Sequence, residues 1–173
     1  RWPYSGAIDD RGNGNAMNLP VPPGLNDTEF RFLFDEAILP AIERFAPQAL
    51  VVTCGADALS GDPLSRLELS NVGLWDAVDR LAELGLPTVV LGGGGYNPWT
   101  VARCWSGLWA RLSKQAIPAQ APPKVEKILA GLDCDLVDEE DVEPDWLQSI
   151  ADEKNEGEVR QQIVRVAERA LAD

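Results

Sequence analysis

The stretch LPTVVLGGGGYNPWT, residues 86–100, decides the fold class. It opens with a continuous apolar and β-branched run, passes through four glycines at 92–95, and enters a helical pattern at Pro98 that lasts to about Leu112. An apolar run of this length, bounded by glycine, is typical of a buried strand. We therefore predict a strand that leads into a helix through a loop almost without side chains.

The stretch ALVVTCG, residues 49–55, repeats the same pattern and predicts a second strand buried on both faces. Between the two runs, apolar residues recur at helical spacing from about Val72 to Leu84. This alternation of strand, helix and strand predicts an α/β fold with a parallel sheet and right-handed crossovers. In such sheets, chemistry gathers at the carboxyl ends of the strands.

The N-terminal third predicts a loop, an extended segment and a helix. Residues 1–15 are rich in Gly, Asp and Asn, and AMNLPVP at 16–22 reads as a short strand. Residues Asn26 and Asp27 are both candidates to open the helix, because Glu29 is placed for a capping box. Apolar residues then continue at helical spacing to Phe45, so this helix faces a core.

The character of the chain changes after Lys114. A Pro/Ala hinge is followed by three short helical patterns and an acidic stretch, DCDLVDEEDVEPD at 133–145, which we interpret as solvated surface. The predicted helices lie near 123–131, 143–151 and 157–172. We predict that the α/β part of the chain spans residues 1–115 and that residues 116–173 form a peripheral helical tail of the same domain.

Composition excludes several classes of function. The 173 residues are 45% hydrophobic, enough for a core, and carry a formal net charge of -13, which disfavours direct binding to nucleic acid or to an anionic membrane. No apolar run approaches the roughly 20 residues that span a bilayer, and the first residues show no signal pattern. Three widely spaced cysteines fit buried thiols in a reducing compartment, so we expect a soluble cytoplasmic protein. The chain has no histidine, so any imidazole chemistry must come from elsewhere.

Two loops at the predicted strand ends carry candidate chemistry. Asp57 is either a turn or capping residue, or a metal ligand or orienting carboxylate, and Asp62 is just as plausibly a turn residue ahead of Pro63. Tyr96 is either a buried aromatic or a hydrogen-bond donor to an oxyanion. The glycines at 92–95 form a phosphate cradle, a tight turn or a mount for Tyr96; the sequence is not GxGxxG, which weakens the first interpretation.

The motifs GADALSGDPL, LGGGGYNPWTVARCW and the opening PYSG…N…NLPVPPG, in this order, resemble the C-terminal half of the zinc-dependent histone deacetylase and acetoin utilisation protein family. The resemblance covers roughly residues 2–113, and the tail with EPDWL resembles the bacterial acetoin utilisation branch. It implies the three-layer arginase-deacetylase fold, of which this chain would be the C-terminal portion, with residues 1–115 as the C-terminal half of the deacetylase catalytic domain. It also implies hydrolysis of N-acetyl amides, either acetyl-lysine or acetylated small amines, by a zinc-activated water.

The resemblance assigns roles to individual residues. Asp57 matches a zinc ligand, and Tyr96 matches the tyrosine that stabilises the oxyanion. The residues that match the acyl-lysine channel are Trp2, Pro63, Leu64, Gly94 and Gly95. Arg103 and Trp105, in the ARCW stretch, are expected to pack rather than to catalyse.

The other zinc ligands and the histidine pair of the family belong to its N-terminal half and are absent from this sequence. We therefore expect the 173-residue chain to be inactive alone, with one Zn²⁺ ligand, and to need the missing N-terminal half as a partner. An exposed strand edge and uncovered apolar faces also lead us to expect self-association. The alternative is a deacetylase-fold binding or regulatory module that has lost its metal.

Overall fold

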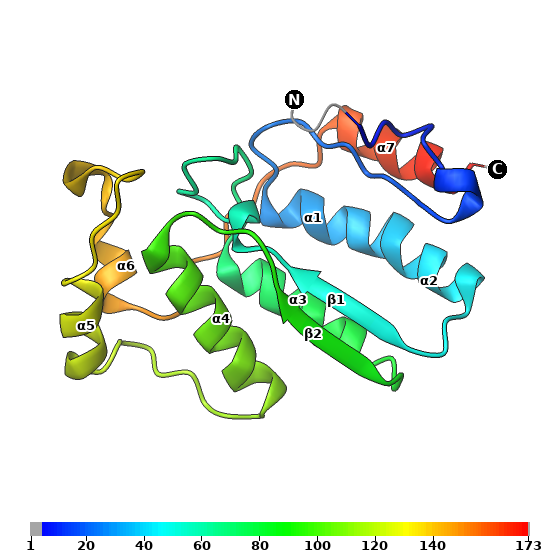
Figure 1. Cartoon of the computed structure of the whole chain (residues 1–173). Helices are drawn as coiled ribbons and strands as arrows, with labels where there is room; N and C mark the ends of the chain where they lie inside the picture. Colours follow the sequence, from blue (N-terminus) through cyan, green and yellow to red (C-terminus); the bar gives the residue numbers. More distant parts are fainter. Residues whose placement is uncertain (1–4, 173) are drawn as a thin grey trace.

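Each of the two apolar runs forms a strand. The computed structural model describes residues 5–172, in which β1 (Leu50–Cys54) and β2 (Thr88–Gly92) pair in parallel (Figure 1). Their register places Leu50 opposite Thr88 and Cys54 opposite Gly92, so both strands end at the same edge of the sheet. The predicted parallel α/β arrangement is confirmed, and the loops that follow the strands begin side by side.

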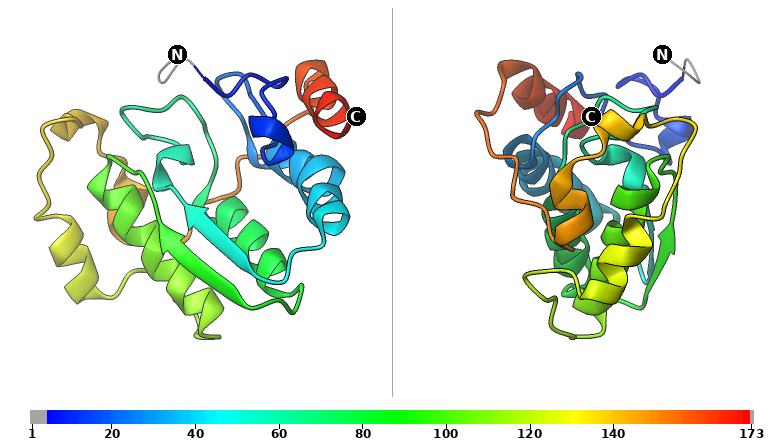
Figure 2. Two further views of the ribbon diagram at one scale, coloured as in Figure 1. Left: turned by 45° about the vertical axis from the view of Figure 1, so that its right-hand side comes forward. Right: turned by 90° about the vertical axis from the view of Figure 1, so that its left-hand side faces the viewer.

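Helices cover one face of this sheet. Val52 and Val90 are partly buried against the core, whereas Val51 and Val89, on the opposite face, are 69% and 54% exposed. Figure 2 shows the strands along one side of the molecule and the helices on the other. The prediction of strands buried on both faces is therefore wrong for the described residues, because the second face meets no element of residues 5–172.

A long helical segment precedes β1. It consists of α1 (Asp27–Leu33), a π-helical turn η2 (Phe34–Ile38) and α2 (Leu39–Phe45). Asn26 forms the predicted capping box with Glu29, because the Asn26 side chain accepts from the Glu29 amide and the Glu29 carboxylate accepts from the Asn26 amide. The predicted strand at 16–22 does not form; the only regular element before α1 among residues 5–172 is the 3-10 turn η1 (Gly12–Gly14), and segment 16–22 packs on the core without a ladder partner.

Two further helices flank β2 in sequence. α3 (Asn71–Ala82) is capped by Ser70, and α4 (Pro98–Leu112) by Asn97. They pack together at Gly107, where an added Cβ would come within 2.0 Å of the buried Trp75 ring. This close contact fixes α4, whose N-terminus starts at the site loops.

The tail divides into two parts. α6 (Pro144–Gln148) packs on α4, and α5 (Pro123–Leu129) packs on α6, with the turn η4 (Glu139–Asp141) between α5 and α6 in sequence. In contrast, α7 (Gln161–Leu171) crosses to α1 at the opposite side of the molecule (Figure 1). α7 contributes four buried residues to the core: Ile163, Val166, Ala167 and Ala170. The expected tail is thus peripheral only in part. No helix within residues 5–172 is both long and apolar enough to cross a bilayer.

Candidate active site

The two loops at the carboxyl ends of the strands are joined by backbone contact. β1 continues through Gly55 into the turn η3 (Ala56–Ala58), which carries Asp57, and β2 continues through the glycines to Tyr96. The amide of Ala56 donates to the carbonyl of Gly94 at 2.7 Å. The parallel register therefore brings both candidate loops into one place.

The glycines are required by this close approach. A Cβ on Gly93 would lie 2.9 Å from the Cα of Gly55, and a Cβ on Gly94 would lie 2.2 Å from Oδ2 of Asp57. Gly95 has φ +142, a backbone conformation in which any residue other than glycine is strained. Because a carboxylate lies against Gly94, a phosphate here would meet a like charge. The geometry favours a tight turn that also mounts Tyr96, and disfavours the phosphate cradle.

The Asp57 carboxylate has no hydrogen-bond partner in the part of the chain that the structure describes. The side chain is half-buried, makes no cap to η3, and accepts no hydrogen bond from residues 5–172. The turn or capping interpretation therefore has no hydrogen bond to support it. A carboxylate at the end of a strand with free lone pairs has the chemistry of a metal ligand.

The described residues alone do not make a zinc site. A catalytic zinc normally takes three protein ligands and leaves a position for water. Among residues 5–172, no group of three His, Cys, Asp or Glu side chains is placed to hold a metal. Asp57 therefore fits one ligand of such a site and requires others from outside this set of residues.

Tyr96 is held by its backbone and exposed at its ring. Its amide donates to Oδ2 of Asp62 at 2.8 Å, and its carbonyl accepts from the Cys134 thiol at 3.7 Å. The residue is 45% exposed, and its hydroxyl has no hydrogen-bond partner within the described chain. The interpretation as a buried aromatic is therefore wrong, and the phenol is available to an external acceptor.

Asp62 has a larger role than its position before Pro63 predicts. It is buried, and its Oδ1 accepts from the amides of Leu64 and Ser65 at 2.9 and 3.0 Å, as expected of a turn residue. Its other oxygen binds the Tyr96 amide 34 residues away. Asn97 adds a second tie, because its Nδ2 donates to the carbonyl of Gly61 at 2.9 Å while its Oδ1 caps α4. The Asn-Pro pair that begins α4 is the sequence signal for the cap; nothing local signals either long-range tie.

The described residues assigned to a channel belong to the two loops that Asp62 joins. Pro63 and Leu64 are exposed, Leu64 to 64%, and Gly94 and Gly95 are half-buried beside Asp57 and Ala56. Trp2 lies outside the described residues. The structure therefore brings together every predicted site residue that it describes.

The neighbouring cysteines and the ARCW residues have structural roles. Burial raises the pKa of the Cys104 thiol to about 12 and raises that of Cys54 above its ordinary value of 9.0, so neither thiol is a nucleophile at neutral pH. Arg103 is buried, donates to the carbonyl of Ser149 at 2.7 Å and pairs with Asp152. The ring of Trp105 packs on Gly92. Arg103 and Trp105 thus pack, as predicted.

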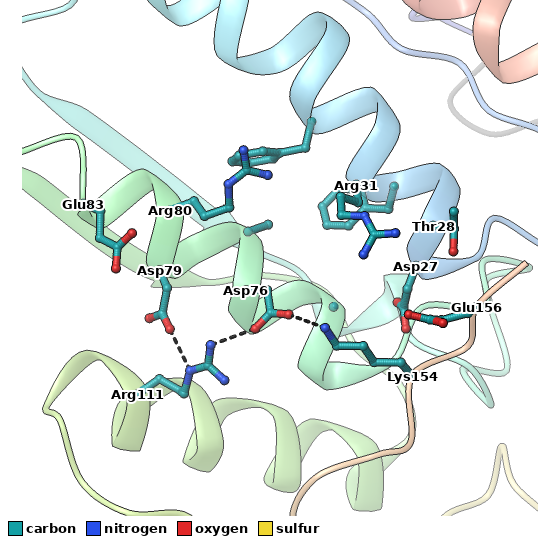
Figure 3. Close-up of a pocket in the computed structure, with 14 residues that line it drawn as sticks. Asp27, Thr28, Arg31, Asp76, Asp79, Arg80, Glu83, Arg111, Lys154 and Glu156 are labelled. Atoms are coloured by element: carbon teal, nitrogen blue, oxygen red, sulfur yellow. Dashed lines mark hydrogen bonds and ion pairs between the residues drawn. The ribbon is translucent and has the colours of Figure 1, made fainter. Parts of the chain in front are cut away.

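A pocket of about 320 Å³ lies apart from these loops, between α1, α3 and the C-terminal part of α4 (Figure 3). Two of its cations pair with carboxylates that line it: Arg111 binds Asp79 at 2.6 Å and Asp76 at 2.7 Å, and Lys154 binds Asp76 at 2.8 Å. Asp57, Asp62 and Tyr96 do not line it. This pocket is therefore not part of the candidate active site.

A model of the histone deacetylase domain matches residues 1–112. The chain belongs to the histone deacetylase family. Histone deacetylase 6 of Arabidopsis thaliana is 43% identical over 108 residues, which are 60% of this chain and 23% of that protein. Histone deacetylase 1 of Homo sapiens is 35% identical over 125 residues, which are 70% of this chain and 26% of that protein.

Solved structures extend the match of this deacetylase-family chain to its tail. An HDAC homologue from Aquifex aeolicus superposes with a TM-score of 0.90 at 32% identity, covering 99% of this chain and 47% of that one. An HDAC homologue complexed with SAHA gives a TM-score of 0.87 with the same identity and coverage. The predicted arginase-deacetylase fold is confirmed, and the chain spans about half the length of these structures.

Proposed function

We propose that this chain is part of a zinc-dependent deacetylase that hydrolyses N-acetyl amides, either acetyl-lysine or acetylated small amines. The observation that carries the proposal is a pair of groups on adjoining loops that have no hydrogen-bond partner among residues 5–172, the Asp57 carboxylate and the Tyr96 phenol. Membership of the histone deacetylase family supports this chemistry. The acetoin utilisation branch and the choice of acetylated substrate stay predictions.

Each residue has a distinct role in the proposed mechanism. Asp57 supplies one ligand to a zinc ion, which, when bound, lowers the pKa of a water and polarises the acetyl carbonyl. The Tyr96 hydroxyl donates a hydrogen bond to the oxygen that gains charge during attack. Pro63, Leu64 and Gly94 form part of the channel wall, with Gly95 beside them and Trp2 as a further aromatic lining residue. The resemblance assigns the general base to a histidine, and this sequence contains none, so a histidine base would come from outside it.

The missing groups define the partner that we propose. An N-terminal half of the catalytic domain would bring the remaining ligands and the base, and would cover the exposed sheet face that carries Val51, Val89 and Leu91. The chain covers 47% of the HDAC homologue from Aquifex aeolicus, and this coverage is consistent with such a partner. Coverage of that face would bury both sides of the strands, as in other parallel sheets.

The test compares the 173-residue chain with a longer protein that includes the proposed N-terminal half. We expect only the longer protein to bind zinc stoichiometrically and to hydrolyse an acetyl-lysine peptide. In it, Tyr96→Phe should lower kcat on the order of 100- to 1000-fold with zinc content unchanged, whereas Asp57→Ala should lose zinc. Stoichiometric zinc and hydrolysis by the 173-residue chain alone would show that the partner is unnecessary.

The second candidate is a binding or regulatory module without catalysis. It is favoured by the absence of histidine from the sequence and of a three-ligand metal group from residues 5–172. The coding sequence upstream of Arg1 discriminates the two. A DxH motif with a histidine pair there supports the enzyme, and an upstream sequence without them supports the module.

A further inference from the structure

We propose that Asp62, together with Asn97, is a positioning clamp that fixes the oxyanion-donating Tyr96 relative to the wall of the substrate channel. The inference rests on the proposed function for the role of Tyr96 and adds a residue that acts through it. Asp62 does not contact substrate in this proposal. It acts only on where the Tyr96 backbone and the turn at Leu64 lie.

One buried carboxylate joins both sides of the site. Asp62 is only 7% exposed, and its two oxygens face different loops. Oδ1 accepts from Leu64 at 2.9 Å and from Ser65 at 3.0 Å, on the proposed channel wall. Oδ2 accepts from the Tyr96 amide at 2.8 Å. A carboxylate only accepts hydrogen bonds, so it suits these three backbone N–H donors. The proposed channel wall and Tyr96 are therefore held by the same side chain.

Asn97 provides the second point of the clamp. Its Nδ2 donates to the carbonyl of Gly61 at 2.9 Å, and the side chain is fully buried. Residues 61 and 62 are therefore bonded in order to residues 97 and 96. Two hydrogen bonds between the same short segments restrict rotation as well as separation, which a single bond does not.

The need for this clamp follows from the exposure of Tyr96. The residue is 45% exposed and its hydroxyl has no partner within the described chain, so no hydrogen bond of the side chain orients it there. The four glycines before it carry no side chains that could brace the loop. An oxyanion donor must sit within about 2.7–3.1 Å of the developing charge, and a misplacement of about 1 Å can cost on the order of 100-fold in rate.

A carboxylate is the side chain that this geometry requires. Asparagine offers one oxygen and an NH₂ group, so Asp62→Asn can accept on one side only and must turn a donor toward the other N–H groups. Asp27 gives a matched control, because it is also 7% exposed and its carboxylate accepts from the amides of Ser70 and Asn155 at 3.0 and 2.8 Å. Asp27 lies at the start of α1, away from the site loops.

The experiment is a double-mutant cycle in the longer, active protein. We expect Asp62→Asn to lower kcat about 10- to 100-fold with little change in zinc content, and Asp27→Asn to lower stability without lowering kcat. Because the clamp acts through the tyrosine hydroxyl, Tyr96→Phe with Asp62→Asn should lose little beyond Tyr96→Phe alone. If the two losses multiply, or if Asp62→Asn leaves kcat unchanged, the clamp is not a positioning device.

A second measurement does not depend on catalysis. The 173-residue chain has two tyrosines, so in this chain a Tyr4→Phe background with fluorotyrosine reports Tyr96 alone by ¹⁹F NMR. Asp62→Asn should shift and broaden this signal, and Asp27→Asn should not; an unmoved signal overturns the proposal. If Asp62→Asn fails to fold, Asn97→Ser keeps a capping oxygen and removes the bond to Gly61, and the same shift and the same non-additivity are required.

These readouts separate the two proposals. Normal kcat in Tyr96→Phe contradicts the proposed function, whatever the NMR signal does. A large loss in Tyr96→Phe with an unchanged Asp62→Asn contradicts the clamp alone.

Discussion

The glycines at 92–95 contact different groups, so substitutions at two of them are expected to have different effects. An added Cβ at Gly93 would meet the backbone of Gly55 at 2.9 Å, which cannot move without shifting the end of β1. At Gly94 it would instead meet the Asp57 carboxylate, the end of a side chain that can rotate. Glycine at position 93 is therefore needed for the backbone packing, whereas glycine at position 94 leaves room for the orientation of Asp57, the proposed metal ligand.

Alanine at these two glycines tests the distinction. Gly93→Ala should lower the free energy of unfolding by about 1–3 kcal/mol through overpacking, measured by urea denaturation. Gly94→Ala should cost less stability but should weaken zinc binding in the longer protein, because Asp57 must turn away. Gly131→Ala is the control, since its Cβ would find no atom closer than 3.5 Å. Equal loss of stability at Gly93 and Gly94, with zinc binding retained, would contradict this account.

Among the elements, α7 shows that part of the tail belongs to the core. Ile163 of α7 is fully buried, and Arg160, just before it, binds Glu29 of α1 with both Nε and Nη2 at 2.5 Å. Figure 2 shows α7, in red, against the N-terminal segments of the chain. The last helix of the tail, α7, therefore packs against α1 and η2 and is part of the helical layer.

Alanine substitutions at two isoleucines, one buried in α7 and one exposed in α5, test whether α7 folds together with the core. Ile163→Ala should lower the free energy of unfolding by about 2–5 kcal/mol, because it leaves a cavity in the core. Ile128→Ala, in α5 where the residue is 57% exposed, should change the free energy of unfolding little. Thermal and urea unfolding both report the difference, and similar values for the two variants would mean that α7 does not fold with the core.

The Glu29–Arg160 pair predicts how stability depends on pH. Burial alone would raise the pKa of Glu29, but hydrogen bonds from Arg160 and Asn26 outweigh it and hold the pKa below its ordinary value of 4.5. A carboxyl with a lowered folded pKa stabilises fully above 4.5, and this contribution is lost as pH falls through the folded value. We expect Glu29→Gln to be less stable than the wild type at neutral pH, with the gap narrowing below pH 4.5. Urea titrations of both proteins from neutral to acid pH measure the gap; a gap that stays constant contradicts the linkage.

The sequence predicts these elements unequally, for physical reasons. Helix starts at Asn26 and Pro98 are encoded by local capping chemistry, so they are predicted closely. The strands were recognised by apolar runs, but a run does not say which face is covered in a given chain. The Asp62–Tyr96 bond joins residues 34 apart and has no local signal, so only the folded chain reveals it. Asp57 and Tyr96 were identified by family resemblance, and the site roles of both stay predictions.

At the scale of the whole molecule, the main feature is the face of the β1–β2 sheet that the helices of residues 5–172 leave uncovered. Val51, Val89 and Leu91 are 69%, 54% and 48% exposed on the strand face opposite the helices. Both strands also have an edge without a ladder partner in residues 5–172. A face and edges of this kind promote pairing with another chain.

We therefore predict that the 173-residue chain, in the absence of the proposed N-terminal half, self-associates as its concentration rises. The double substitution Val51→Thr and Val89→Thr keeps β-branched side chains that suit strands but removes apolar contact area, so it should shift the population toward monomer. Ile128→Thr alters a similarly exposed apolar side chain away from the sheet and should leave association unchanged. Sedimentation velocity over a concentration series measures the distribution. A wild-type chain that stays monomeric throughout, or an equal effect of Ile128→Thr, would show that the sheet face is not the surface that drives association.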